Sequence, residues 1–389
     1  MNAHHAVILG AGAAGTAAAR ALAGQQDVRL TLLAQSNEQP TSRMLIKGVA
    51  MGMTTPELIR LPLPRAEFVA DTARRVDTAR REVRLASGAV IGYDSLIVAS
   101  GSRARRLDAE LPGVEEAERA GRLLTLHTLD DAMGVRRALL ARGKRARIAI
   151  VGGGLIAAET ASTLQAQGHL VSLIARSELP GVASFGRSVA ARIAADHRSH
   201  VSTYFGRSVS RISSEGAASV ISLDDGGAIA ADLIIMALGT EPLSPAPWEN
   251  GIDVDDRLRA HGVEGVYAAG GVSVHHDDHL GTWRIDHWED SMAQATHAAQ
   301  ALLHGLALGQ DPGSYRPRSA HMAMMYGRMI SGVGIGGFPE TEADAGAEAR
   351  DAEEFLVLHQ HQGTVVGASG VDAVGEVYQW GQRLHTVEA

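Results

Sequence analysis

Short apolar runs recur along the chain, and each run ends in small or polar residues. Residues 6–9 (AVIL) lead into a glycine-rich turn and an alanine-rich stretch, and residues 28–33 (VRLTLL) follow. Residues 147–151 (RIAIV) and 170–174 (LVSLI) repeat this order later in the chain. Continuous apolar runs of this length that alternate with helical stretches are typical of strands buried in a parallel sheet. The pattern predicts an α/β fold with two units of similar plan.

Three further apolar runs end in small residues and close these units. They are residues 93–103 (YDSLIVASGSR), 231–240 (ADLIIMALGT) and 265–272 (GVYAAGGV). The third run follows the second unit in the chain but has the character of a first-unit strand, so we expect the second unit to be inserted into the first. We also expect antiparallel strands within residues 68–85 and a long helix over residues 283–303.

The last part of the chain carries strand patterns of a different kind, which predict a third, α+β domain. The expected elements are strands at 329–333, 354–359 and 364–368, a hairpin turn at Gln362-Gly363 and a helix near 375–384. A chain of 389 residues is too long for one compact core. The predicted domains are 1–110 together with 241–318, then 111–240, and finally 319–389.

A glycine turn joins the first strand to the first helix in both units. Gly10, Gly12 and Gly15 form a G-x-G-x-x-G pattern, and Gly152 and Gly154 begin the second turn, which has alanine in the third place. The first glycine permits the tight turn, the second lets the backbone approach a pyrophosphate, and the third lets helix and strand pack closely. One such turn is common as a structural corner. Two of them predict two dinucleotides, for which FAD and a nicotinamide nucleotide are the economical pair.

Composition and charge exclude several functional classes. The formal net charge is −8 without a long basic stretch, so we expect no nucleic-acid partner. No apolar run approaches the roughly 20 residues that cross a bilayer, and the first strand begins within a few residues of the N-terminus. We therefore expect a cytoplasmic protein without a transmembrane segment.

The chain contains no cysteine, which rules out a structural disulfide, cysteine-bound metal and a redox-active dithiol. Electrons that reach a flavin must then leave it directly. The run His275 to His279 (HHDDH) offers metal-ligand residue types. Adjacent residues rarely converge on one ion, so we expect a polar loop there and no metal site.

Nucleotide preference is predicted from the residues that follow each second strand, where a carboxylate usually holds the adenosine ribose. In the first unit Gln35 stands at this position, with Glu38 as the other candidate. In the second unit Arg176 follows Ala175, and an arginine there accommodates a 2′-phosphate. NADPH is therefore slightly favoured over NADH, and a solvent-facing Arg176 is an equally good interpretation.

These motifs together resemble the FAD-dependent pyridine-nucleotide oxidoreductase superfamily over essentially the whole chain. The resemblance is strongest to single-component ferredoxin, rubredoxin and putidaredoxin reductases and to apoptosis-inducing-factor-like proteins. The motifs that carry it are residues 10–15, 93–107, 152–159, 265–271 and 283–295. Within the last motif, WRIDHWEDSMAQA is similar to the family pattern Arg-x-Glu-x-Trp-x-x-Ala-x-x-Gln.

The resemblance implies two Rossmann-like dinucleotide-binding domains, the second inserted in the first, and a C-terminal α+β interface domain. It implies hydride transfer from a nicotinamide to flavin N5, followed by electron transfer to a ferredoxin-like carrier or a small-molecule acceptor. It leaves a homodimer open. In the family a lysine and a glutamate pair beside the flavin, so Lys47 and Glu159 are the catalytic candidates. Arg43, near Lys47, is either a cation close to the flavin or part of a solvated helix start.

The expected cofactor-binding residues follow the matched motifs. They are Gly10, Gly12, Ala13, Ala14, Gly15, Gln35, Arg43, Lys47, Ala73, Ala99, Ser100, Gly101, Arg103, Gly152, Gly154, Leu155, Ile156, Glu159, Arg176, Gly239, Gly270, Gly271 and Trp288.

Several departures from the family pattern bear on function. The family's aspartate after GVYAAG, which binds the flavin's ribityl chain, is Gly271 here, with Asp277 or Asp278 as candidate substitutes. The reductases carry tryptophans where this chain has residues 320–326 (AHMAMMY), a segment we expect to be a packed linker. Two alternative functions follow. One is a flavoenzyme for a small organic substrate or quinone, with a weakened nicotinamide site. The other is an apoptosis-inducing-factor-like, redox-linked FAD protein.

Overall fold

The computed structural model describes residues 3–36, 38–216, 218–278, 280–337, 342–343 and 355–385. The chain forms two compact units, each assembled from three segments. Unit 1 comprises residues 1–42, 60–103 and 240–319, and unit 2 comprises residues 43–59, 104–239 and 320–389.

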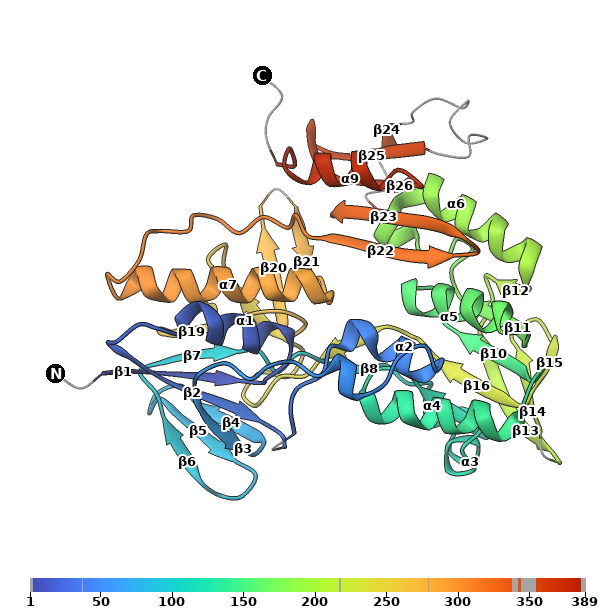
Figure 1. Cartoon of the computed structure of the whole chain (residues 1–389), viewed down its shortest axis with the longest axis horizontal. Helices are drawn as coiled ribbons and strands as arrows, with labels where there is room; N and C mark the ends of the chain where they lie inside the picture. Colours follow the sequence, from blue (N-terminus) through green and yellow to red (C-terminus); the bar gives the residue numbers. More distant parts are fainter. Residues whose placement is uncertain are drawn as a thin grey trace. The chain divides into compact units, whose positions relative to one another are not determined.

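Unit 1 is built on a five-stranded sheet in which all neighbouring strands are parallel, in the order β19-β7-β1-β2-β3. Its strands are β1 (His4–Leu9), β2 (Val28–Ala34), β3 (Glu67–Ala70), β7 (Ser95–Val98) and β19 (Val266–Ala268). The side chains of β7 and β19 are buried throughout, which explains their largely apolar sequence. Helices α1 (Ala13–Leu22) and α7 (Trp288–Gly305) pack side by side, dark blue and orange in Figure 1.

Smaller sheets complete unit 1. Strands β4 (Ala73–Asp77), β5 (Glu82–Leu85) and β6 (Val90–Gly92) form an antiparallel sheet, as expected within residues 68–85. The first strand of that stretch, β3, instead pairs in parallel with β2. Further strands are β18 (Ile252–Val254), β20 (Ser273–Asp277) and β21 (Gly281–Trp283), which form one sheet, and β8 (Ser102–Ala104) with β17 (Thr240–Pro242).

Unit 2 repeats the parallel sheet, in the order β12-β11-β10-β16-β9. Its strands are β9 (Leu123–Thr125), β10 (Arg147–Val151), β11 (Leu170–Ala175), β12 (Ser202–Phe205) and β16 (Leu233–Met236). As in unit 1, an antiparallel sheet is inserted between strands of the parallel sheet. It consists of β13 (Val209–Glu215), β14 (Ala218–Leu223) and β15 (Ala228–Ala231), which come between β12 and β16 in the chain. The helices are α3 (Val114–Arg119), α4 (Leu129–Arg142), α5 (Leu155–Ala166) and α6 (Val182–His200).

Residues 43–59 belong to unit 2, although the sequence analysis grouped them with the first domain. They form two short 3-10 helices, Arg43–Leu45 and Glu57–Ile59, and helix α2 (Ile46–Ala50). Ile46 and Val49 are buried in the same apolar cluster as Val135 of α4. Burial against α4 therefore decides which unit this segment joins.

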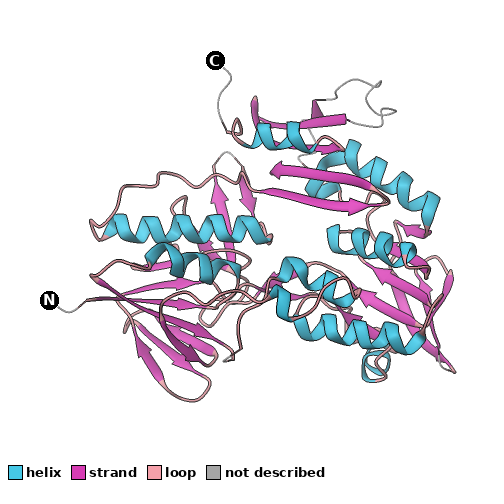
Figure 2. Cartoon of the chain, viewed as in Figure 1, coloured by secondary structure: helices cyan, strands magenta, loops and turns pink. Residues whose placement is uncertain are grey.

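The C-terminal part of unit 2 is an antiparallel sheet in the order β22-β23-β26-β25-β24, on which α6 and α9 pack (Figure 2). Its elements are β22 (Ala320–Met325), β23 (Arg328–Gly334), β24 (Glu342–Ala343), β25 (Phe355–His361), β26 (Thr364–Val371) and α9 (Val374–Gly381). Gln362 and Gly363 form the predicted hairpin turn, both with positive φ. The expected linker 320–326 is instead mostly strand β22, and Glu354 lies outside the described residues.

The helix expected over residues 283–303 begins later, at Trp288. Trp283 ends β21, where it pairs with His275, and the intervening residues form a loop. The expected polar loop at His275 is largely strand β20, because Ser273 to Asp277 pair with β18 and β21. Asp278 lies in the turn after β20, and His279 lies outside the described residues.

Candidate functional site

The first glycine turn closes tightly on neighbouring backbone. Gly10 has φ +106°, and a Cβ there would lie 2.9 Å from the carbonyl carbon of Ala99 and closer still to its oxygen. A Cβ on Gly15 would lie 2.8 Å from the carbonyl carbon of Gly10 and again closer to the oxygen. Both positions therefore require glycine. A Cβ on Gly12, by contrast, would meet nothing within 4 Å.

The open space at Gly12 coincides with the start of α1. Gly12 is the N-cap of this helix, and no side chain caps it. The backbone N–H groups of Ala13 and Ala14 in the first turn thus have no side-chain acceptor from the cap, and the first turn carries no acidic residue. An uncapped helix start with open space before it fits the pyrophosphate of a dinucleotide.

Small residues follow the neighbouring strands of the same sheet. Ala99, Ser100 and Gly101 come directly after β7. Gly270 and Gly271 come after β19, and Gly270 has φ +78° with its missing Cβ directed at Ser291 and Ala14. These turns bring backbone close to the end of β1, where ligands of open α/β sheets bind.

The structure places an acidic side chain against Gly271. A Cβ on Gly271 would lie 2.9 Å from Cγ of Asp286 and closer still to its Oδ1. Asp286 lies in the loop before α7, and its Oδ2 accepts hydrogen bonds from Thr240 Oγ1 and from Arg284 Nη2. Asp286 occupies the glutamate position of the family pattern Arg-x-Glu-x-Trp, but it was not among the expected cofactor-binding residues.

The remaining candidates of unit 1 are more scattered. Gln35 and Glu38 follow β2 and are exposed, and Ala73 begins β4. Arg103 is ion-paired with Glu241, Nε to Oε1 2.9 Å. Trp288 is the half-buried first residue of α7.

A buried polar network behind Gly270 was also missed. The amide oxygen of Gln294 accepts hydrogen bonds from the Gly270 N–H at 2.8 Å and from Ser273 Oγ at 2.7 Å. Its Nε2 donates to Asp290 Oδ2 at 2.6 Å, and the Tyr315 hydroxyl donates to Asp290 Oδ1 at 2.8 Å. Burial raises the pKa of Asp290. The network fixes the glycine turn against α7, and it joins Asp290 and Gln294 of the 283–295 motif to residues distant from them in sequence.

The second glycine turn has the same form in unit 2. A Cβ on Gly152 would lie 2.7 Å from the carbonyl carbon of Ala237, whereas a Cβ on Gly154 would meet nothing within 4 Å. Gly154 is the N-cap of α5 without a side-chain cap. Leu155 and Ile156 form the first turn, and Ile156 is 40% exposed. Gly239, after β16, has φ +81° and open space around it.

Lys47 of α2 and Glu159 of α5 form an ion pair between Nζ and Oε2, with side-chain exposures of 21% and 14%. The other oxygen, Oε1, accepts the backbone N–H of Met324 in β22 at 3.3 Å. The contact that the family resemblance implied is therefore present, whereas its catalytic role stays a prediction. Arg43, in the same segment, bonds His127, Nη1 to Nε2 2.9 Å.

Arg176 is exposed directly after β11, and Ala175 before it is buried. A second arginine lies nearby, since the backbone N–H of Arg207 donates to the carbonyl oxygen of Ala175 at 3.1 Å. The Arg207 guanidinium is ion-paired with Asp225, Nε to Oδ2 2.8 Å.

Imidazoles can transfer protons or bind metal ions, and those of His275, His287 and His321 each have a defined environment. His275 stacks on Trp283 with ring centroids 3.7 Å apart, and burial lowers its pKa to about 4. Burial also lowers the pKa of His287, the N-cap of α7, and His321 Nε2 lies 3.3 Å from the carbonyl oxygen of Ser184. Among the described residues no His, Asp and Glu side chains gather in a group of three or more that suits a metal ion. Within the same described residues, none of the helices has the length and apolar character needed to cross a membrane.

Comparison with known proteins agrees with this geometry. The family model described as pyridine nucleotide-disulphide oxidoreductase matches residues 4–301. A biphenyl dioxygenase system ferredoxin–NAD(+) reductase component from Paraburkholderia xenovorans strain LB400 is 28% identical over 95% of this chain and 90% of its own length.

Solved structures agree on the fold. A putidaredoxin reductase in covalent complex with putidaredoxin is similar with a TM-score of 0.84 and 22% identity, over 98% of this chain and 93% of that one. An engineered water-forming NADPH oxidase bound to NADPH is similar with a TM-score of 0.76 and 20% identity, over 98% of this chain and 91% of that one. The predicted fold class, with two Rossmann-like units, is confirmed. The chain belongs to the pyridine nucleotide-disulphide oxidoreductase family.

Proposed function

We propose that this protein is an FAD-dependent NAD(P)H oxidoreductase that passes electrons to a ferredoxin-like carrier. The observation that carries the proposal is the pair of uncapped glycine turns, each with open space at its second glycine. Unit 1 fits FAD, because its turn is surrounded by the small residues after β7 and β19. Unit 2 fits the nicotinamide nucleotide at Gly154 and the start of α5.

The cofactor supplies the redox chemistry when bound, since a flavin accepts a hydride and releases electrons one at a time. The chain's residues bind and orient. The backbone N–H groups at the start of α1 and of α5 hold phosphates. Lys47, held by its ion pair with Glu159, would offer an ammonium group to negative charge that develops on a bound cofactor.

The absence of cysteine separates this chain from the disulphide-reducing side of its family. No dithiol can receive electrons, so an external acceptor must take them directly. A relative named as a ferredoxin reductase component and a structural neighbour in complex with putidaredoxin support a ferredoxin-like acceptor. A small apolar acceptor such as a quinone is the second candidate, which the exposed side chains of Met322 (44%) and Met324 (51%) favour.

Ala175, Arg176 and Ser177 favour NADPH as the electron donor. Arg176 is exposed after β11, where the 2′-phosphate of NADPH lies in such folds. The engineered NADPH oxidase carries substitutions to alanine, arginine and serine at three consecutive positions, which is the same order of residues. The relative from Paraburkholderia is named for NAD(+), so we expect a preference and not an absolute choice.

Anaerobic stopped-flow reduction tests this function. We expect the flavin absorption band to bleach within one turnover on mixing with NADPH, and more slowly with NADH. Arg176→Ala should lower the preference for NADPH over NADH about tenfold, because one charge-assisted phosphate contact is lost. Arg207→Ala is the matched control, since its guanidinium is held by Asp225. We expect it to keep the preference.

Three results would count against the proposal. A flavin that stays oxidised with both nucleotides refutes the reductase, and an unchanged preference in Arg176→Ala refutes the role of that residue. Steady-state turnover then distinguishes the acceptors. Reduction of a quinone without reduction of any [2Fe-2S] ferredoxin would replace the first candidate by the second.

A further inference from the structure

We propose that Asp286 supplies the carboxylate that this family carries at the position of Gly271, and that it binds hydroxyl groups of the bound FAD. This inference rests on the proposed function, because it concerns the same flavin. It deepens that function by naming a binding residue that has moved from the turn after β19 to the loop before α7.

The space beside Gly271 is the first observation. Any side chain at position 271 would begin within 2.9 Å of Cγ of Asp286, with Oδ1 nearer still. The Asp286 carboxylate therefore lies where an aspartate at position 271 would begin to extend. Glycine at 271 and the carboxylate of Asp286 are complementary, because each leaves room for the other.

Asp286 is also held in a defined orientation. Its Oδ2 accepts hydrogen bonds from Thr240 Oγ1 and from Arg284 Nη2, the latter at 3.3 Å. Arg284 in turn donates from Nε to the carbonyl oxygen of Gly271 at 2.7 Å. Oδ2 is thus engaged by Arg284 of the same loop and by Thr240 of β17, while Oδ1 faces the glycine turn. The side chain remains 24% exposed and so is accessible to a ligand.

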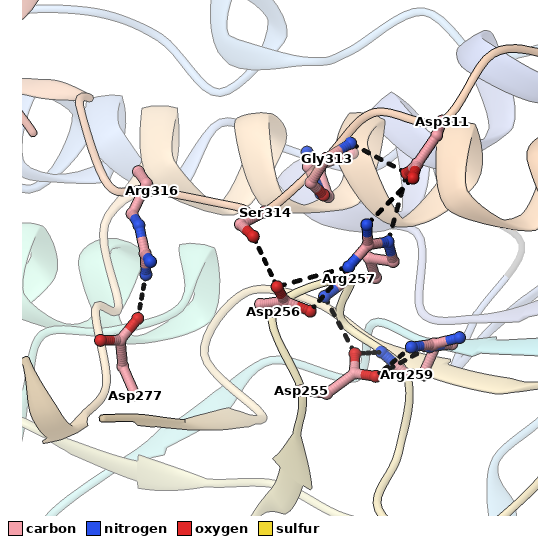
Figure 3. A network of polar contacts seen from close by, with 10 residues as sticks. Asp255, Asp256, Arg257, Arg259, Asp277, Asp311, Gly313, Ser314 and Arg316 are labelled. Carbon is pink, nitrogen blue, oxygen red and sulfur yellow. Dashed lines mark hydrogen bonds and ion pairs between the residues drawn. The ribbon is translucent and has the colours of Figure 1, made fainter. Parts of the chain in front are cut away.

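The other acidic residues of this region are engaged elsewhere. Asp277 pairs with Arg316 and accepts the backbone N–H of Leu280 at 2.9 Å, and Figure 3 shows the Arg316 pair. Asp290 is 1% exposed, with both oxygens hydrogen-bonded inside the molecule. Asp278 lies in an exposed turn beyond β20. Of these carboxylates, Asp286 alone is positioned against Gly271.

Flavin binding by the full-length protein tests the proposal. Flavin-free protein is titrated with FAD and flavin fluorescence is followed. Asp286→Asn keeps the shape, but its amide oxygen is held by Arg284 and Thr240, so an NH₂ group replaces the acceptor beside Gly271. We expect the Kd for FAD to rise at least about tenfold, as for loss of a charged hydrogen bond. Asp277→Asn is the matched control, and its Kd should stay within about twofold.

Thermal unfolding separates ligand binding from a structural role. A residue that contacts FAD should reduce the rise in Tm that added FAD produces while leaving the Tm of the flavin-free protein nearly unchanged. Equal losses of Tm with and without FAD would make Asp286 a structural residue and overturn the proposal.

Moving the carboxylate back provides a second variant. Gly271→Asp alone should weaken FAD binding, because two carboxylates would share one space, whereas Gly271→Asp combined with Asp286→Gly should regain most of the affinity. Wild-type protein that binds no FAD would overturn both this proposal and the proposed function. Wild-type protein that binds FAD with the same Kd as Asp286→Asn would overturn this proposal alone.

Discussion

The two glycine turns of this chain share a backbone form but differ in how closely helix and strand approach. In unit 1 the third position of the turn is Gly15, where an added Cβ would overlap the carbonyl group of Gly10. In unit 2 the third position is Ala157, whose Cβ would lie 3.4 Å from a Cβ on Gly152, an ordinary contact. The start of α1 thus lies closer to its glycine turn than the start of α5 does, by about the room that one methyl group needs.

The glycines of the two turns thus meet two separate requirements. The second glycine of both turns, Gly12 and Gly154, has open space around it, so protein packing does not require glycine there and the proposed dinucleotide does. The third glycine is required by packing in unit 1, and the turn of unit 2 keeps the same backbone form with alanine at that position. Substitutions at the second and third positions should therefore have different effects.

The largest expected effect is that of Gly15→Ala. The new methyl group meets backbone that cannot move without displacing β1, so we expect unit 1 to lose about 4 kcal/mol or more of unfolding free energy, together with its bound flavin. The matched change in unit 2, Ala157→Gly, should cost only about 1 kcal/mol. Urea unfolding of both variants checks this. Equal losses would show that the two turns are packed alike.

Acid should destabilise the protein through histidines that are buried in the neutral form. Burial lowers the pKa of His359 and of His197 in unit 2 to about 4, as it does for His275 in unit 1. In the unfolded chain each of these histidines has a pKa near 6.5. As the pH falls, the unfolded state therefore binds protons at a higher pH than the folded state does. The free energy of unfolding should be independent of these histidines above about pH 6.5. It should fall as the pH drops towards 4, by about 3 kcal/mol for each such histidine.

His359→Gln sharpens this prediction. Between pH 6.5 and 4 we expect the slope of unfolding free energy against pH to decrease by about one proton, because a glutamine carries no titrating group. His261→Gln, an exposed position in unit 1, serves as the control. Urea unfolding at several pH values measures both slopes. An unchanged slope in His359→Gln would mean that this imidazole is already accessible to protons in the folded state.

The smallest expected effects on stability are those of Gly12→Ala and Gly154→Ala, since neither methyl group meets protein atoms. Each should weaken its own dinucleotide at least about tenfold, or 1.4 kcal/mol. Gly12→Ala should lose FAD, whereas Gly154→Ala should keep FAD and bind the nicotinamide nucleotide poorly. Flavin content and a nucleotide titration separate the two. Loss of both ligands in either variant would break the assignment of one ligand to each turn.

Much of this arrangement could be predicted because the determining signals are local. The apolar run of residues 6–9 and the glycines after it specify a buried strand and a turn within about ten residues. The Lys47 and Glu159 contact was implied by the family resemblance. Parallel pairing of β3 was not predicted, since the alternation of side chains gives no direction for the neighbouring strand.

The remaining differences involve residues distant in sequence. The apolar residues of α2 are consistent with a buried face, but nothing in their local sequence identifies α4 as the helix that covers it. Within the methionine-rich segment 320–326, residues 322–325 alternate exposed and buried positions as a strand does, but methionine is not a typical strand residue. Asp286 was recognised only as part of the family pattern, because its relation to Gly271 arises when the loop before α7 folds back on the turn after β19.

The position of β19 and α7 in the sequence has a consequence for synthesis of the protein. The edge strand β19 and the helix that covers α1 come from residues 266–305, whereas β1 and α1 come from residues 4–22. At a ribosomal rate of ~5–20 residues per second, the N-terminal elements emerge roughly tens of seconds before their partners. The parallel sheet of unit 2, by contrast, is encoded within residues 123–236. All strands of that sheet are therefore synthesised while α1, which follows the glycine turn of unit 1, still lacks its partner α7.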